Sequence, residues 1–96
     1  MSVRVTISCQ VKPDQIKALL PFLEDNLPNV RGFKGNVQVR VLFDENNNEI
    51  LLDEEWLTVE SHLAYLSFIN KNGVMDELGS FLCSPPNIKY FDKLEI

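Results

Sequence analysis

The chain has 96 residues, of which 45% are hydrophobic and 24% are charged, so residues 1–96 are expected to form one soluble globular domain. The net charge of −5 and the scattered Lys and Arg residues argue against nucleic-acid binding, because contacts to phosphates need clustered basic side chains. The chain has no signal-peptide core and no apolar run near the ~20 residues that span a bilayer, so we expect a cytoplasmic protein that makes no membrane contact.

A strand followed by a helix is predicted at the beginning of the chain. Apolar residues occupy every second position over residues 3–11, which is the pattern of a strand with one apolar face. Pro13 and Asp14 predict a helix start, because Pro suits the first helical position and an acid complements the helix dipole. Apolar residues at spacings of three and four predict a helix that bends at Pro21 and ends at Pro28.

A hairpin of two strands is predicted after this helix. Gly32 and Gly35 lie in a turn over residues 29–35, where glycine supplies backbone angles that other residues avoid. Residues 36–43 and 49–56 alternate between apolar and polar positions, as strands do. The segment between them is rich in Asp and Asn, which is typical of a hairpin turn.

The second half of the chain predicts two helices and a last strand. Thr58 is expected to cap a helix that stops at Asn72 and Gly73, and a short helix follows over residues 74–82. Residues 87–96 alternate as a strand. Right-handed crossovers fold this order into an α+β, ferredoxin-like βαββαβ domain, with the short extra helix before the last strand and both main helices on one face of the sheet.

The other face of such a sheet has no cover within one chain. Leu42, Leu51 and Phe91 would add apolar area to it, and exposed apolar area of this kind marks an interaction surface. Because most soluble oligomers are symmetric dimers, we expect a homodimer that pairs through the open sheet face.

Chemically versatile residues gather where the third strand runs into a helix, over residues 53–68. This segment holds the only Trp, Trp56, the only His, His62, and one of the two Tyr residues, Tyr65. Glu54 falls on the apolar face of the strand, where a carboxylate costs free energy unless it is hydrogen-bonded. Two interpretations of Glu54 remain, a structural group held by backbone donors, which is favoured, or an acid with a raised pKa.

The cysteines do not indicate a metal or redox site. Cys9 and Cys83 have neither CxxC nor metal-ligand spacing, so both are expected to be reduced, structural thiols. We therefore predict no metal and no cofactor.

The order and spacing of several segments resemble the antibiotic biosynthesis monooxygenase superfamily, whose members are dimeric α/β-barrel proteins. The resemblance covers nearly the whole chain. It rests on Val11-Lys12-Pro13-Asp14 after the first strand, Arg31-Gly32-Phe33-Lys34-Gly35 before the second, Glu54-Glu55-Trp56 before a His-bearing helix, and Pro85-Pro86 before the last strand.

The resemblance implies a dimeric α/β barrel with a pocket in each subunit between sheet and helices. Trp56 matches the family tryptophan and Glu54 the acid two residues before it. Many members place a His nine residues after this Trp, where this chain has Tyr65, and His62 lies one turn earlier. The first strand lacks the Asn used by haem-degrading members, which argues against haem degradation.

The activity that the resemblance implies is cofactor-independent monooxygenation of a small aromatic substrate, a quinol or phenol that itself donates electrons to O2. His62 would act as the base because its ordinary pKa lies near neutrality. Tyr65 would donate a hydrogen bond to the substrate oxygen, and Trp56 would stack on a flat ring. The residues expected to bind substrate are Trp56, Glu54, Phe68 and Arg40.

Other function classes remain open for the same fold. One is a non-catalytic dimeric protein that binds a small hydrophobic ligand. Another is a stress-response protein whose cavity is plugged by its own side chains, such as Phe68, Met75 and Phe81. A third is an isomerase of a small metabolite, a reaction that other members of the family carry out.

Overall fold

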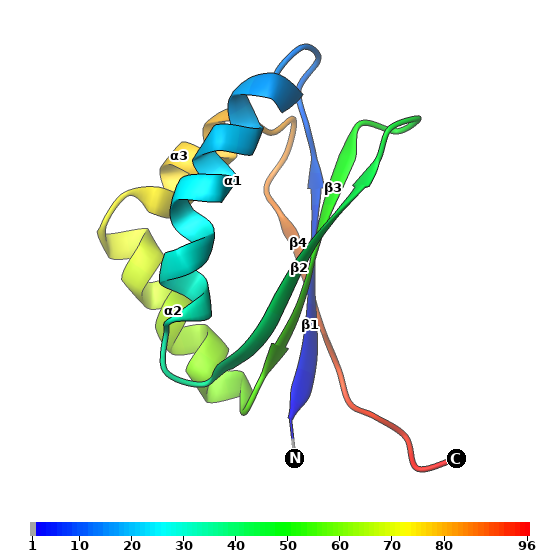
Figure 1. Ribbon diagram of the computed structural model, residues 1–96, viewed down its shortest axis with the longest axis vertical. Coiled ribbons are helices and arrows are strands. Elements are labelled where there is room, and N and C mark those ends of the chain that lie inside the picture. The colour runs from blue at the N-terminus through cyan, green and yellow to red at the C-terminus, as the bar shows by residue number, and fades with distance from the viewer. Residues whose placement is uncertain (1) are drawn as a thin grey trace.

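The computed structural model describes residues 2–96 and consists of one four-stranded antiparallel sheet covered on one face by helices (Figure 1). The elements are β1 (Val3–Gln10), α1 (Ile16–Arg31), β2 (Asn36–Asp44), β3 (Glu49–Trp56), α2 (Val59–Lys71), α3 (Val74–Ser80) and β4 (Asn87–Phe91). The strand order is β2-β3-β1-β4, which confirms the predicted ferredoxin-like arrangement. The sheet of one chain is open, with β2 and β4 at its edges.

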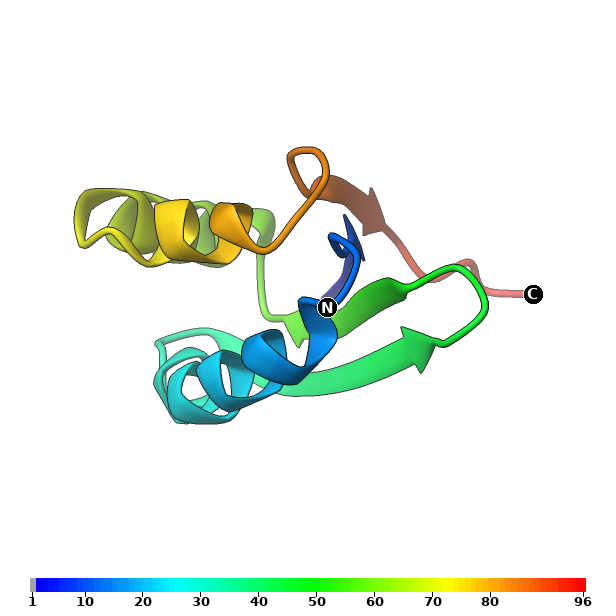
Figure 2. The ribbon, with the colours of Figure 1, turned by 90° about the horizontal axis from the view of Figure 1, so that it is seen from above.

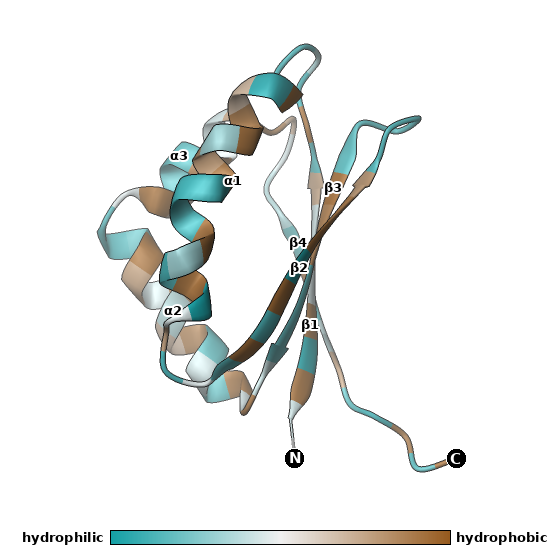
Figure 3. Ribbon diagram, in the orientation of Figure 1, coloured by the Kyte–Doolittle hydropathy of each residue, from teal (hydrophilic) through white to brown (hydrophobic). Residues whose placement is uncertain are grey.

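The helices form two rows over the same face of the sheet. Figure 2 shows α1 in one row and α2 with α3 in the other, with the strands to one side of both. Apolar and polar residues alternate along the elements (Figure 3), so that each strand turns one set of side chains toward the helices. On β1 these are Val3, Val5, Ile7 and Cys9, all buried.

Helix α1 begins later and ends later than predicted. Asp14 has a φ of 63°, which is outside the helical region, so Pro13 and Asp14 form a turn and the helix begins at Ile16. Pro28 lies inside the helix rather than at its end. A proline removes only its own N–H, and the chain re-forms the pattern after it, because the Gly32 N–H donates to the Pro28 carbonyl at 3.0 Å.

Strand β4 is shorter than predicted, ending at Phe91 instead of continuing to residue 96. Phe91 pairs with Arg4, one residue from the start of β1, so few partner residues remain beyond it. Leu94 and Ile96 are consequently exposed. Helix α3 also ends early, at Ser80 instead of residue 82.

The open face of the sheet combines apolar and charged side chains. Leu42 and Phe91 are about half exposed on it, at 49% and 50%. Asp53 lies between two arginines, 3.0 Å from Arg4 and 3.6 Å from Arg40. Within residues 2–96, no helix has the length and apolar character needed to cross a bilayer.

Both cysteines are free thiols, as expected. Cys9 is buried among the apolar residues of β1, and this burial raises the pKa of its thiol to about 11. Cys83 is exposed, and its Sγ lies 3.6 Å from the Val11 carbonyl oxygen.

Candidate functional site

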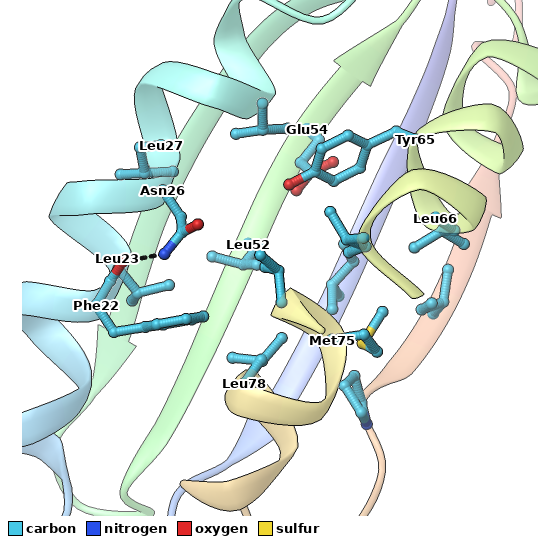
Figure 4. A pocket seen from close by; sticks show the side chains of 16 residues that line it. Phe22, Leu23, Asn26, Leu27, Leu52, Glu54, Tyr65, Leu66, Met75 and Leu78 are labelled. Carbon is cyan, nitrogen blue, oxygen red and sulfur yellow. Dashed lines mark hydrogen bonds between the residues drawn. The ribbon is translucent and has the colours of Figure 1, made fainter. Parts of the chain in front are cut away.

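A cavity lies between the sheet and the two rows of helices (Figure 4). Its volume is about 590 Å³ when the space at its open mouth is included, and only a small part of that volume lies in the enclosed interior. Most of its wall is apolar: Ile7, Phe22, Leu23, Leu27, Val30, Leu52, Leu66, Ile69, Val74, Met75, Leu78, Pro86 and Ile88. Three side chains bring polar atoms to it, Asn26 from α1, Glu54 from β3 and Tyr65 from α2.

Glu54 is a buried carboxylate that faces this cavity. The alternation of β3 turns it toward the helices together with Ile50 and Leu52, and it is only 3% exposed. The Trp56 indole Nε1–H donates to Glu54 Oε1 at 2.8 Å. Burial raises the pKa of Glu54, and the bond from Trp56 offsets part of this rise. Glu54 is therefore an acid with a raised pKa, and its anchor is a side-chain donor rather than the backbone.

His62 lies behind Glu54 and does not line the cavity. It is fully buried in the first turns of α2, and its Nδ1 is 2.8 Å from the Tyr90 hydroxyl on β4. Its Nε2 is 3.9 Å from Glu54 Oε1 and has no hydrogen-bond partner among residues 2–96. Burial lowers the pKa of His62 to about 4, so the ring is neutral near pH 7.

Tyr65 supplies a neutral hydroxyl at the same end of the cavity as Glu54 (Figure 4). Burial, with a further contribution from the charge of Glu54, raises the pKa of Tyr65 to about 12. Its ring packs against Trp56 and Phe33, with centroids 5.6 and 5.2 Å apart. Packing on two rings fixes the direction of the hydroxyl, which remains a hydrogen-bond donor at ordinary pH.

The other residues expected at the site lie outside the cavity wall. Trp56 is fully buried between Phe33 and His62, so its ring has no free face toward the cavity. Phe68 is 49% exposed and packs against Phe33. Arg40 lies on the opposite face of the sheet beside Asp53. The structure thus brings Glu54, Trp56, His62 and Tyr65 together and leaves Phe68 and Arg40 apart from them.

Two polar residues of this region were missed by the sequence analysis. Asn26 lies in the apolar stripe of α1, and its amide donates to the Phe22 carbonyl at 2.8 Å while its oxygen points away from that bond (Figure 4). The sequence pattern that could have identified Asn26 is a polar residue within the apolar stripe of α1. Tyr90 shares the alternation of Ile88, which indicates the helix-facing side, but its contact with His62 depends on how two separate elements pack.

The junction between β3 and α2 is fixed by short-range hydrogen bonds. Thr58 caps α2, as predicted, and its Oγ1 accepts from the Ser61 N–H at 3.1 Å. The Leu57 N–H donates to the Gly35 carbonyl at 2.8 Å, which ties the loop after α1 to the junction. These contacts set the positions of Glu54 and His62 on either side of the turn.

The chain was compared with protein families and with solved structures. The family model described as antibiotic biosynthesis monooxygenase matches residues 2–67. Among curated proteins, no sequence matches the chain significantly.

Solved structures with the same fold cover nearly the whole chain. Rv0793 from Mycobacterium tuberculosis is 17% identical, with a TM-score of 0.84 over 100% of this chain and 98% of its own. A conserved protein from Methanosarcina mazei Go1 is 17% identical, with a TM-score of 0.86 over 98% and 94% of the two chains. The monooxygenase from the gene ActVA-Orf6 of Streptomyces coelicolor, solved in complex with nanaomycin D, is 11% identical, with a TM-score of 0.81 over 99% and 89%. At these identities the similarity concerns the fold.

Proposed function

The chain belongs to the antibiotic biosynthesis monooxygenase family, and on that premise we propose that it is a cofactor-independent monooxygenase acting on a small phenol or quinol. The observation that carries the proposal is Glu54, a carboxylate with a raised pKa facing a cavity that is otherwise almost wholly apolar. A carboxylate whose pKa is raised accepts a proton from a weak acid more readily than an ordinary carboxylate does.

The proposed reaction begins when Glu54 takes the acidic proton of the substrate. The substrate anion then passes one electron to O2, and the resulting radical and superoxide combine to form a C–O bond and a peroxide anion. Protonation of the peroxide, loss of the C–H proton that remains on the oxygenated carbon to Glu54, and cleavage of the O–O bond give a carbonyl and hydroxide. Hydroxide takes up the proton from Glu54 and leaves as water, so substrate and O2 yield a ketone or quinone and one water.

The side chains around Glu54 have distinct roles in this proposal. Glu54 replaces His62 as the base, because only Glu54 lines the cavity and His62 is a weak base with a pKa of about 4. Tyr65 donates a hydrogen bond to the substrate oxygen and stabilises the charge that develops there. Trp56 is a positioning residue, since its N–H holds Glu54 Oε1.

The lining also bears on the type of ligand. Among the residues that line the cavity in the described chain, none is Lys or Arg, and the one carboxylate is that of Glu54. A phosphorylated metabolite would therefore enter without a cationic partner and close to a carboxylate. This composition favours a neutral phenol or quinol over the substrate of an isomerase that acts on phosphorylated compounds.

Binding without turnover is the second candidate, and the narrowness of the cavity favours it. The enclosed part of the cavity is small, and its wall is apolar except for Asn26, Glu54 and Tyr65. A protein of this kind would bind a hydrophobic ligand and show no consumption of O2.

Oxygen uptake tests the proposal. The protein is supplied with hydroquinones and anthrones without added flavin, metal or haem, and uptake is compared between the natural chain and Glu54→Gln. We expect the variant to lose roughly 10²–10⁴-fold in rate, the usual contribution of a positioned base. Glu60→Gln, an exposed change on α2, is the matched control and should leave uptake unchanged.

The two candidates predict different results in the same experiment. No uptake across the panel, together with saturable binding of the same compounds, would favour the binding protein. Uptake that survives in Glu54→Gln would remove Glu54 as the base.

A further inference from the structure

His62 and Tyr90 connect the inner side of Glu54 with the protein surface. His62 is fully buried, and its Nδ1 is 2.8 Å from the Tyr90 hydroxyl. Its other nitrogen, Nε2, lies 3.9 Å from Glu54 Oε1 and has no hydrogen-bond partner within residues 2–96. Tyr90 is 38% exposed at the outer strand β4. The three side chains therefore form a polar line from the cavity wall to the surface, on the side of Glu54 that a substrate does not reach.

A buried imidazole nitrogen without a partner is costly, because a polar atom removed from water loses its hydrogen bonds. The wall around the cavity is apolar, so it offers a proton few groups to travel along. The unpartnered Nε2 is instead directed at the carboxylate that the proposed function uses as the base.

We propose that His62 and Tyr90 form a proton path by which Glu54 exchanges protons with solvent without passage through the cavity. The inference deepens the proposed function and rests on it for the role of Glu54 as the base. A small movement of the Glu54 side chain closes the 3.9 Å gap to hydrogen-bond distance. Tyr90 and His62 touch neither substrate nor O2, so they are positioning and proton-conducting residues.

Each group on the proton path accepts one proton and releases one proton. Outward, the Glu54 carboxyl gives its proton to His62 Nε2, Nδ1 gives its proton to the Tyr90 oxygen, and the Tyr90 hydroxyl releases its own proton to water. Inward, the same steps in reverse return a proton to Glu54 and restore the starting tautomer of His62. The proposed reaction uses one transfer in each direction, outward when the substrate anion forms and inward when the peroxide is protonated.

The ionisation of Glu54 can be followed without any substrate turnover. Trp56 is the only tryptophan, and its indole N–H is bonded to Glu54, so its fluorescence reports the charge on that carboxylate. Equilibrium titration of this fluorescence gives the pKa of Glu54. Glu54→Gln identifies the signal, because that variant keeps only the change caused by His62 near pH 4. A laser-triggered photoacid pH jump then gives the rate at which Glu54 is protonated.

Tyr90→Phe is the decisive variant. It removes the hydroxyl and keeps the ring of a side chain that is partly exposed, so the fold should persist. We expect protonation of Glu54 to slow by about tenfold or more, because proton transfer needs hydrogen-bond contact at every step. His62→Gln should slow it similarly, and Lys89→Gln, on the opposite face of the same strand, should not.

A protonation rate in Tyr90→Phe equal to that of the natural chain would overturn the proton path. Since the assay uses no oxidisable substrate, a negative oxygen-uptake experiment does not affect it. Conversely, an unaltered rate in Tyr90→Phe combined with loss of uptake in Glu54→Gln would leave the base assignment in place and remove only the path.

Discussion

Glu54 and His62 are two buried titratable groups whose pKa values move in opposite directions, and the stability of the protein should record both. The raised pKa of Glu54 means that its contribution is complete below its unfolded value and is lost as the pH rises through its folded value. The pKa of His62 falls from 6.5 to about 4, so its contribution is present above pH 6.5 and is lost as the pH falls.

Single substitutions should separate these two contributions to the free energy of unfolding. In Glu54→Gln, His62 is the one of these two groups that still titrates. The free energy of unfolding of this variant should rise by up to about 3 kcal/mol from pH 4 to 6.5. In His62→Gln the free energy of unfolding should instead fall as the pH rises above 4.5, which is the ordinary pKa of a Glu side chain. Urea denaturation at a series of pH values measures this, with Glu60→Gln as the control. Parallel profiles in both variants would show that neither group is perturbed by burial.

At the scale of single residues, the sequence predicted the neighbourhood of the site better than the roles within it. The period of two placed Glu54 and Trp56 on one face, and helical spacing placed His62 and Tyr65 on one side of α2. The roles depend on side-chain directions. The Trp56 indole turns its N–H to Glu54, and His62 turns toward Tyr90, a contact between two elements that no local pattern encodes.

At the scale of elements, the junction of β3 and α2 depends on the close approach of the loop that precedes β2. Gly35 has a φ of 95°, and a Cβ added there would lie 2.4 Å from Ser61 Oγ and 2.5 Å from Ser61 Cβ. The loop can reach α2 only because this position has no side chain.

Gly35→Ala should therefore destabilise the protein by about 3 kcal/mol, through backbone strain together with the steric clash. Gly79→Ala is a matched control, because a Cβ at Gly79 on α3 meets nothing within 4 Å. It should stabilise the protein by about 0.5–1 kcal/mol through higher helix propensity. Thermal and urea unfolding of the two variants measure the difference. Equal effects would mean that the loop relaxes freely.

The number, type and order of elements follow from periodicity, whereas their ends do not. Helix α1 passes through Pro28 because a proline removes one hydrogen bond without preventing the next turn. Strand β4 stops at Phe91 because β1 has almost no residues left to pair with it. Alternation continues in the sequence beyond Phe91, but a strand also needs a partner, and that is a property of the whole sheet.

At the scale of the whole molecule, the cavity requires nearly the entire chain. The family model covers residues 2–67, yet Met75, Leu78, Pro86 and Ile88 from later elements complete the wall. For this reason we propose that residues 1–96 act as one domain and that a segment limited to the matched region would lack a closed cavity.

We also propose that two copies pair through the open sheet face. Leu42→Lys should weaken this pairing by placing a charge on a half-exposed apolar position of that face. Leu20→Lys is the control, since Leu20 is 44% exposed on α1, away from the sheet face. Light scattering at micromolar concentration should give a dimer for the natural chain and the control, and a smaller mass for Leu42→Lys. A monomeric natural chain would contradict the proposal.

Met75 lines the cavity, and under the proposed chemistry its oxidation would gradually inactivate the protein. Its thioether is the most readily oxidised group in that wall, and superoxide and peroxide would form in the same cavity. The sulfoxide is polar, so each oxidised molecule would bind apolar ligands less well. Mass spectrometry after prolonged turnover should find one added oxygen on Met75 in parallel with lost activity. A Met75→Leu variant should stay active for longer, and reductase treatment should restore the natural chain.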